Sequence, residues 1–133
     1  MIAELILSIV ISWLFVKIVK FIIFWHKAKE FSLNFFLYDG GMPSSHTVLV
    51  VSLATALFIE TGLSYVFAIS VVLALIVMSD AIKVRRVTEE QSKVLNKLQK
   101  DKKLDEHVGH KPIEVLVGVV LGIIIPIIVY ALL

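Results

Sequence analysis

The fold is decided by a long apolar stretch at residues 44–79, which is SSHTVLVVSLATALFIETGLSYVFAISVVLALIVMS. About 20 apolar residues are enough to carry a helix across about 30 Å of hydrocarbon, so this stretch is too long for one crossing. Glu60-Thr-Gly interrupts it near the middle. The pattern predicts two short membrane-spanning helices, at about residues 44–60 and 63–79, joined by a tight turn.

Two further apolar runs flank this pair, at residues 2–25 and 113–133, and each is long enough to span a membrane. The whole chain is 59% hydrophobic with a mean hydropathy of +0.95, beyond the roughly half apolar content of soluble domains. We therefore predict an all-α, polytopic membrane helix bundle with four transmembrane helices. Residues 1–133 are expected to form a single integral membrane domain.

The last apolar run contains two features that bear on packing. Gly118 and Gly122 form a Gly-x-x-x-Gly pair, which lets helix backbones approach closely. Packing inside the bundle is the favoured interpretation, and a dimer seam is the alternative. Pro126 is expected to kink this helix.

The main polar segment lies between the third and fourth runs, at residues 80–111. Its apolar residues recur at helical spacing, and Thr88-Glu-Glu-Gln has the form of a capping box. We predict one cytoplasmic amphipathic helix starting there and resting on the headgroups or the bundle. Its lysines are interleaved with acids and no aromatic platform accompanies them, which argues against a nucleic-acid partner.

The basic residues are distributed on one side only. The Ile2 end, the Glu60 turn and the C-terminal end carry no Lys or Arg. Because Lys and Arg are enriched in cytoplasmic loops, we predict a multi-pass protein of the cell membrane with the polar insert at the cytoplasmic face and both termini opposite. The chain has no cysteine, which excludes disulfides and thiolate chemistry.

Four polar pieces at the ends of the apolar runs are predicted to lie together on that cytoplasmic side: Lys20 and residues 39–46, 80–86 and 109–114. Polar groups beside hydrocarbon tend to be retained for function. One of them, Pro43-Ser-Ser-His, opens a helix. The first N–H groups of a helix lack internal partners and attract phosphate. Ser44 and Ser45 add hydroxyl donors, while His46 exchanges protons near neutral pH.

A second histidine stands at the start of the fourth run. His110 precedes Pro112, and Glu114 follows His110 at the i+4 position. On a helix that continued back through His110, the two side chains would meet on one face. A carboxylate bonded to one ring nitrogen would leave the other nitrogen free as a nucleophile or base.

Cations complete this group of residues. Lys20, Arg85 and Arg86 approach the same interface, and both residue types suit phosphate oxygens. Other lysines near the end of the first run are expected to snorkel to the headgroups, namely Lys17, Lys27 and Lys29. Two histidines, a carboxylate, a helix N-terminus and fixed cations together suit phosphoryl transfer.

The order of these motifs is Lys, Pro-Ser-x-His, Arg and His-x-x-x-acid, and it resembles the type 2 phosphatidic acid phosphatase and vanadium haloperoxidase superfamily. Longer segments, including Asp-Gly-Gly-Met-Pro-Ser-Ser-His and Gly-His-Lys-Pro-Ile-Glu-Val, look like its divergent branch of small membrane proteins. This closer similarity runs from Lys20 to Gly122.

The resemblance implies a role for each matching residue. His110 would be the nucleophile on phosphorus, Glu114 would orient it, and His46 would protonate the leaving group and then activate water. Residues expected to bind the phosphate oxygens are Lys20, Ser44, Ser45 and Arg85 or Arg86. Residues expected to support the site are Asp39, Gly40, Gly41 and Asp80. The superfamily's glycine before the first histidine is Ser45 here.

The predicted function is hydrolysis of a lipid phosphomonoester or diphosphate through a phosphohistidine, without metal or cofactor. The expected partners are that substrate, membrane lipids and a second copy of the chain. A non-catalytic lipid-phosphate binding or scaffold protein is one alternative. Another is a metal-dependent membrane hydrolase, since histidines and carboxylates suit divalent ions; its ligands would come from His46, His107, His110, Asp39, Asp80 and Glu114.

Overall fold

The computed structural model describes residues 2–28, 41–99, 103–106 and 108–133. Within these segments the secondary structure is helical and contains no strand. The helices are α1 (Ile2–Ala28), α2 (Ser45–Thr61), α3 (Tyr65–Ile82), α4 (Val84–Leu98) and α5 (Pro112–Leu132). The all-α prediction is confirmed for this part of the chain, and α1, α2, α3 and α5 fall on the four predicted apolar runs.

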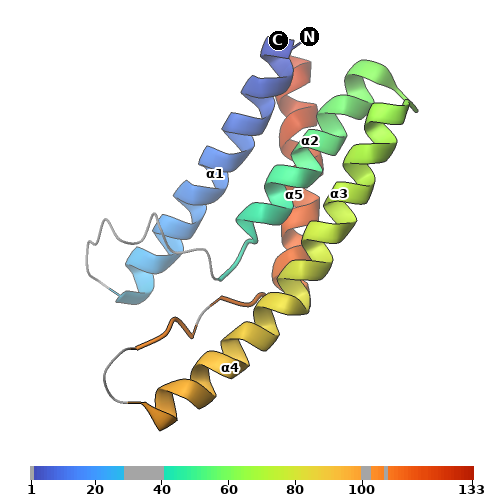
Figure 1. Cartoon of the computed structure of the whole chain (residues 1–133). Helices are drawn as coiled ribbons and strands as arrows, with labels where there is room; N and C mark the ends of the chain where they lie inside the picture. Colours follow the sequence, from blue (N-terminus) through green and yellow to red (C-terminus); the bar gives the residue numbers. More distant parts are fainter. Residues whose placement is uncertain (1, 29–40, 100–102, 107) are drawn as a thin grey trace.

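Helix α2 is central in the bundle, since it packs against α1, α3 and α5. Figure 1 shows both chain termini at the same end as the connection between α2 and α3, whereas α4 extends from the opposite end. The start of α2 and the start of α5 lie near the α4 end. The arrangement therefore gathers the segments that carry the candidate site at one end of the bundle.

Three helical segments are long and apolar enough to cross a membrane: residues 2–26, residues 65–98, whose apolar part is α3, and α5. Helix α2 is apolar but shorter, at 17 residues. Many large apolar side chains on α1, α3 and α5 are exposed on the bundle surface, as expected where lipid surrounds a protein. The chain is a membrane protein, and the fourth crossing stays a prediction.

Helices α2 and α5 approach closely at the two predicted glycines. A Cβ atom added at Gly118 would lie 3.0 Å from Thr47 Cβ, and one added at Gly122 would lie 2.7 Å from Val51 Cβ. Both glycines are buried. The prediction that this pair serves packing inside the bundle is confirmed, and α5 continues as one helix through Pro126.

The turn between α2 and α3 forms where Glu60-Thr-Gly interrupts the apolar stretch. Gly62 ends α2 with a φ of +61°, in the left-handed region that glycine adopts readily. Ser64 then caps α3, because its hydroxyl oxygen accepts a hydrogen bond from Phe67 N at 3.2 Å. At this end Tyr130 donates a hydrogen bond to Glu60 at 2.7 Å, which ties α5 to α2.

Helix α4 begins earlier than the sequence pattern predicts. It starts at Val84, and Lys83 alone separates it from α3, so α4 continues α3 beyond the bundle in Figure 1. The Thr88 hydroxyl donates to Val84 O at 3.1 Å inside the helix. The predicted start and capping box at Thr88 are wrong, because residues 83–87 contain no Gly or Pro to interrupt the helix.

Candidate functional site

The start of α2 is organised by Ser44, which is fully buried. Its hydroxyl oxygen accepts hydrogen bonds from Thr47 N at 3.4 Å and from Thr47 Oγ1 at 2.9 Å. Ser44 thus occupies the N-cap position, as its place before an apolar helix suggests. Ser45, the first helical residue, is 4% exposed, and its Oγ has no hydrogen-bond partner among the described residues.

Two backbone hydrogen bonds join three helices at this point. Ser44 N donates to Glu114 O at 3.2 Å, so the start of α2 lies against the first turn of α5. His110 N donates to Ala81 O at 3.2 Å, which fixes the residue before α5 against the end of α3. The two histidine motifs, which lie more than 60 residues apart in the sequence, therefore meet in space.

His110 is a buried polar side chain where α2, α3 and α5 meet. It is 2% exposed, and neither of its ring nitrogens has a hydrogen-bond partner in the described structure. Burial lowers its pKa below the ordinary 6.5, and the positive charges of Lys20, His46 and Arg85 lower it further, while Glu114 opposes them. The ring is therefore neutral near neutral pH, and the four predicted residues act on it from four different helices.

Helix α1 contributes two buried lysines. Lys20 is 4% exposed and Lys17 is 7% exposed. The Lys17 ammonium lies 5.7 Å from the centre of the Trp13 ring. The prediction that Lys17 snorkels to the surface is wrong, because its side chain faces the bundle interior beside an aromatic ring; the side chains of Lys27 and Lys29 lie outside the described part of the chain.

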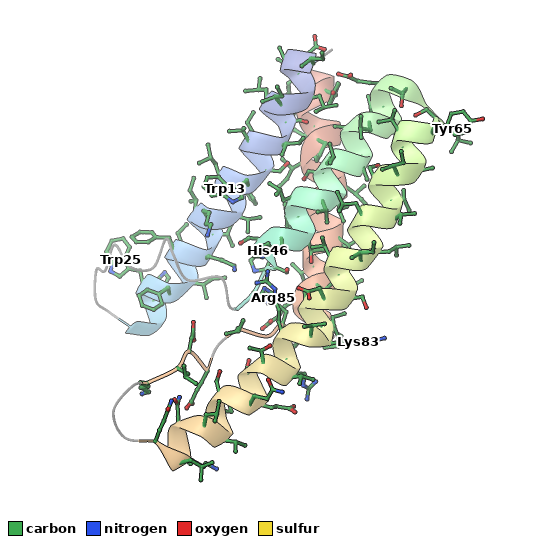
Figure 2. The ribbon with its side chains drawn as sticks, viewed as in Figure 1. Trp13, Trp25, His46, Tyr65, Lys83 and Arg85 are labelled. Atoms are coloured by element: carbon green, nitrogen blue, oxygen red, sulfur yellow. The ribbon has the colours of Figure 1, made fainter. Side chains whose placement is uncertain are left out.

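The structure distinguishes the two neighbouring arginines. Arg85 is 29% exposed, and its Nε donates to Asp80 Oδ2 at 3.1 Å. Arg86 is 61% exposed and pairs with Glu90 at 3.6 Å. Figure 2 draws Arg85 at the same end of the bundle as His46. Arg85 is thus the arginine that acts on His110, and Asp80 holds its guanidinium in place.

The predicted hydrogen bond between His110 and Glu114 is absent. Glu114 Oε2 instead accepts a hydrogen bond from Lys111 N at 3.0 Å, at the start of α5. The helix does not continue back through His110, because Pro112 restricts the residue before it to an extended conformation, and Lys111 has a ψ of 150°. Glu114 still acts on His110 through its charge.

A pocket of about 580 Å³ lies on the α4 side of His110. Its wall includes His110 and Glu114 together with polar residues of α4. One of these is Glu89, whose Oε2 accepts a hydrogen bond from Gly109 N at 3.1 Å. This contact could not be predicted from the sequence, since Glu89 belongs to a charged helix face and no motif distinguishes it from its neighbours.

The remaining predicted residues are placed as follows. Gly41 is exposed, has a φ of +81° and lines the pocket. Asp39, Gly40 and His107 lie outside the described residues. Among the residues that the structure describes, no three His, Asp or Glu side chains are grouped so that they could hold a metal ion. The candidate ligands of the metal-dependent alternative that lie in the described part of the chain therefore do not form a metal site of this kind.

Comparison with known proteins gives one family and one similar protein. The family model described as "Divergent PAP2 family" matches residues 2–125. The chain is also 36% identical, over 140 aligned residues, to the "Uncharacterized membrane protein YuiD" of Bacillus subtilis (strain 168). That alignment covers 90% of this chain and 89% of the relative. No solved structure shows a significant match.

Proposed function

Because this chain belongs to the divergent PAP2 family, we propose that its buried polar junction is the active site of a membrane lipid-phosphate phosphatase. Membership confirms the resemblance drawn from the sequence motifs, while the activity is our proposal. The substrate is a lipid phosphomonoester or diphosphate. Hydrolysis proceeds through a phosphohistidine on His110 and uses cations and backbone dipoles in place of a metal.

One observation carries the proposal. Three buried polar atoms at the junction of α2 and α5 have no hydrogen-bond partner among the described residues: Ser45 Oγ and both ring nitrogens of His110. Leaving a buried donor or acceptor unpaired costs about 1–3 kcal/mol. A bound phosphoryl group would accept a hydrogen bond from the Ser45 hydroxyl and an electron pair from His110, which supports a phosphate ligand here.

The first chemical step follows from the charges around His110. Its lowered pKa keeps the ring neutral, so a nitrogen lone pair is available to attack phosphorus. As the N–P bond forms, the bond from phosphorus to the leaving oxygen breaks, and His46 donates the proton that this oxygen takes up. Lys20 and Arg85 stabilise the negative charge on the transferring phosphoryl group.

The second step reverses the roles. His46, now without its proton, activates a water molecule that attacks the phosphohistidine. The O–P bond forms, the N–P bond breaks, and phosphate leaves while His110 becomes neutral again. The alternation requires both histidines to face one phosphoryl group, which is consistent with the electrostatic effect of His46 on His110.

Topology forms a further part of the proposal. A helix of 17 residues spans about 25 Å at 1.5 Å per residue, so α2 crosses if the bilayer thins slightly. The chain then crosses four times, with the active site at the cytoplasmic face of the cell membrane, as the distribution of Lys and Arg indicates. A homodimer remains a prediction.

A lipid-phosphate binding protein is the second candidate, and one observation favours it. Glu114 is hydrogen-bonded to the backbone of Lys111, so among the described residues no carboxylate orients the His110 ring through a hydrogen bond. A site that kept its cations and lost this orientation would retain phosphate affinity without fast turnover.

The deciding experiment measures phosphate release by the purified protein from phosphatidate, a prenyl phosphate, a prenyl diphosphate and phosphatidylglycerol phosphate. Vanadate binding is measured in parallel, because vanadate mimics a phosphoryl group in transfer. His110→Ala should abolish release and retain vanadate binding, while the exposed control Lys103→Ala should change neither. Wild-type protein that binds several lipid phosphates and releases phosphate from none would establish the binding function instead.

A further inference from the structure

We infer that Glu89 of α4 is a positioning residue, which holds the backbone segment that carries His110 in its reactive orientation. The inference rests on the proposed function, in which His110 attacks phosphorus. It assigns a role in the site to α4, whose charged face the sequence presents as a solvated surface.

The segment after α4 folds back along this helix. Leu104 N donates to Asn96 Oδ1 at 2.8 Å, and Asn96 Nδ2 donates to Leu104 O at 2.9 Å. Asn96 Nδ2 also donates to Glu106 Oε1 at 2.7 Å. The returning segment is thus fixed to α4 at Asn96, about two turns beyond Glu89.

Glu89 fixes the end of the same segment, directly before the histidine. Its Oε2 accepts a hydrogen bond from Gly109 N at 3.1 Å, while its Oε1 forms an ion pair with Lys93 at 2.5 Å. The Glu89 side chain is 22% exposed. Hydrogen bonds to an ionised acceptor are stronger than neutral ones, and Lys93 contacts the other oxygen of the same carboxylate.

Steric contact adds a second constraint at the same residue. A Cβ atom at Gly109 would lie 2.8 Å from Arg86 Cα and 3.1 Å from Glu89 Oε2. The backbone therefore lies directly on α4, and any side chain at Gly109 would lift it. The adjacent amide is fixed as well, because His110 N donates to Ala81 O.

The backbone contacts at Gly109 and His110 orient the histidine, which is the role that was expected of Glu114. Both ring nitrogens of His110 lack a hydrogen-bond partner among the described residues, so the ring direction is set by its packing and by the backbone that bears it. Two consecutive amides, of Gly109 and His110, are held by Glu89 and Ala81. Together they fix the direction of the Cα–Cβ bond of His110.

The kinetic consequence follows from the geometry of attack. A reacting atom displaced by about 1 Å can cost about 100-fold in rate. Glu89→Ala should therefore lower kcat by about 10- to 100-fold and leave KM within about twofold. Glu89→Gln should restore most of kcat, since its amide oxygen still accepts the hydrogen bond from Gly109 N. A residue needed only for folding would not show this division between kcat and KM.

An activity-independent measurement accompanies the kinetics. Diethyl pyrocarbonate modifies accessible imidazole, and peptide mass spectrometry reads modification at His110 in the detergent-solubilised full chain. His110 should be labelled several-fold faster in Glu89→Ala than in the wild type, and at the wild-type rate in Glu89→Gln. The matched control is Gln91→Ala, an exposed position on the same helix, which should change neither labelling nor kcat.

Gly109→Ala tests the same contact with the Glu89 carboxylate intact, and it should reproduce the Glu89→Ala pattern. The positioning role is overturned by unchanged His110 labelling in Glu89→Ala, by unchanged kcat in that variant, or by an equal loss in Gln91→Ala. A wild-type protein that releases no phosphate would defeat the proposed phosphatase alone, because the labelling experiment still reports whether Glu89 holds His110.

Discussion

Replacement of Gly122 by alanine should separate α2 from α5 and weaken the bundle. The added Cβ would lie 2.7 Å from Val51 Cβ, whereas ordinary contact begins at 3.4 Å, so the helices must move apart by about 0.7 Å. At Gly118 the corresponding atom is Thr47 Cβ at 3.0 Å, which requires about 0.4 Å. The two variants have the same chemistry and differ only in the displacement that they force.

Two opposing free energies decide the outcome. Alanine stabilises a helix interior by about 1 kcal/mol relative to glycine, while overpacking a filled interface costs about 1–3 kcal/mol. We expect Gly122→Ala to lose about 1–2 kcal/mol, because its added Cβ would lie 2.7 and 2.9 Å from two atoms of the Val51 side chain, and at such distances the helices must shift. Gly118→Ala should be close to neutral, since about half the displacement is needed.

The assay is thermal unfolding in detergent, followed through Trp13 and Trp25 fluorescence, with vanadate affinity measured on the same samples. Val120→Ala, on the exposed face of α5, is the control. Gly122→Ala should have the lowest Tm and a weaker vanadate affinity, because the starts of α2 and α5 form one site. An equal or higher Tm for Gly122→Ala than for Gly118→Ala would show that α2 and α5 do not meet at Gly122.

Three further predictions concern charge. Arg85→Glu should abolish vanadate binding while Arg86→Glu weakens it little, as measured by calorimetry, and equal losses would indicate a diffuse basic surface. A cysteine introduced at Lys97 should react with an impermeant maleimide only after the cells are opened, and reaction in intact cells would reverse the proposed orientation. The contribution of neutral His110 to stability should be full above pH 6.5 and fall as the pH drops below that value. The reason is that the pKa of His110 is lowered in the folded chain, so the unfolded chain binds the proton more tightly. Tm measured against pH should become flatter in His110→Gln, and an unchanged slope would contradict the burial of this ring.

The positions of the helices could be predicted because local rules govern them. Apolar runs of sufficient length gave α1, α3 and α5, and Glu60-Thr-Gly gave the break before α3. Ser44 was a predictable cap, because its side chain bonds to Thr47 in the first turn of the same helix. Motif order also predicted the family, since it depends on residue types along the chain.

Errors arose where two local signals competed. The i+4 spacing of His110 and Glu114 suggested one helical face, but α5 begins at Pro112 between them and does not extend back to His110. The Thr88 motif suggested a helix start, but α3 is followed almost directly by α4, so Thr88 lies within helix α4 and not at its start. In both cases the backbone conformation of neighbouring residues decided where the helix begins, and the side-chain pattern did not.

The sequence by itself determined the apolar helices, the cap of α2 and the set of residues able to carry phosphoryl chemistry, because each depends on residue type and short spacing. Only the tertiary structure decided which of these residues act together. It selected Arg85 over Arg86, buried Lys17, and placed Glu89 against Gly109. The reason is physical: burial and contact between distant segments depend on how helix faces pack, and a charged side chain on an amphipathic helix has the same sequence pattern whether it meets water or another backbone.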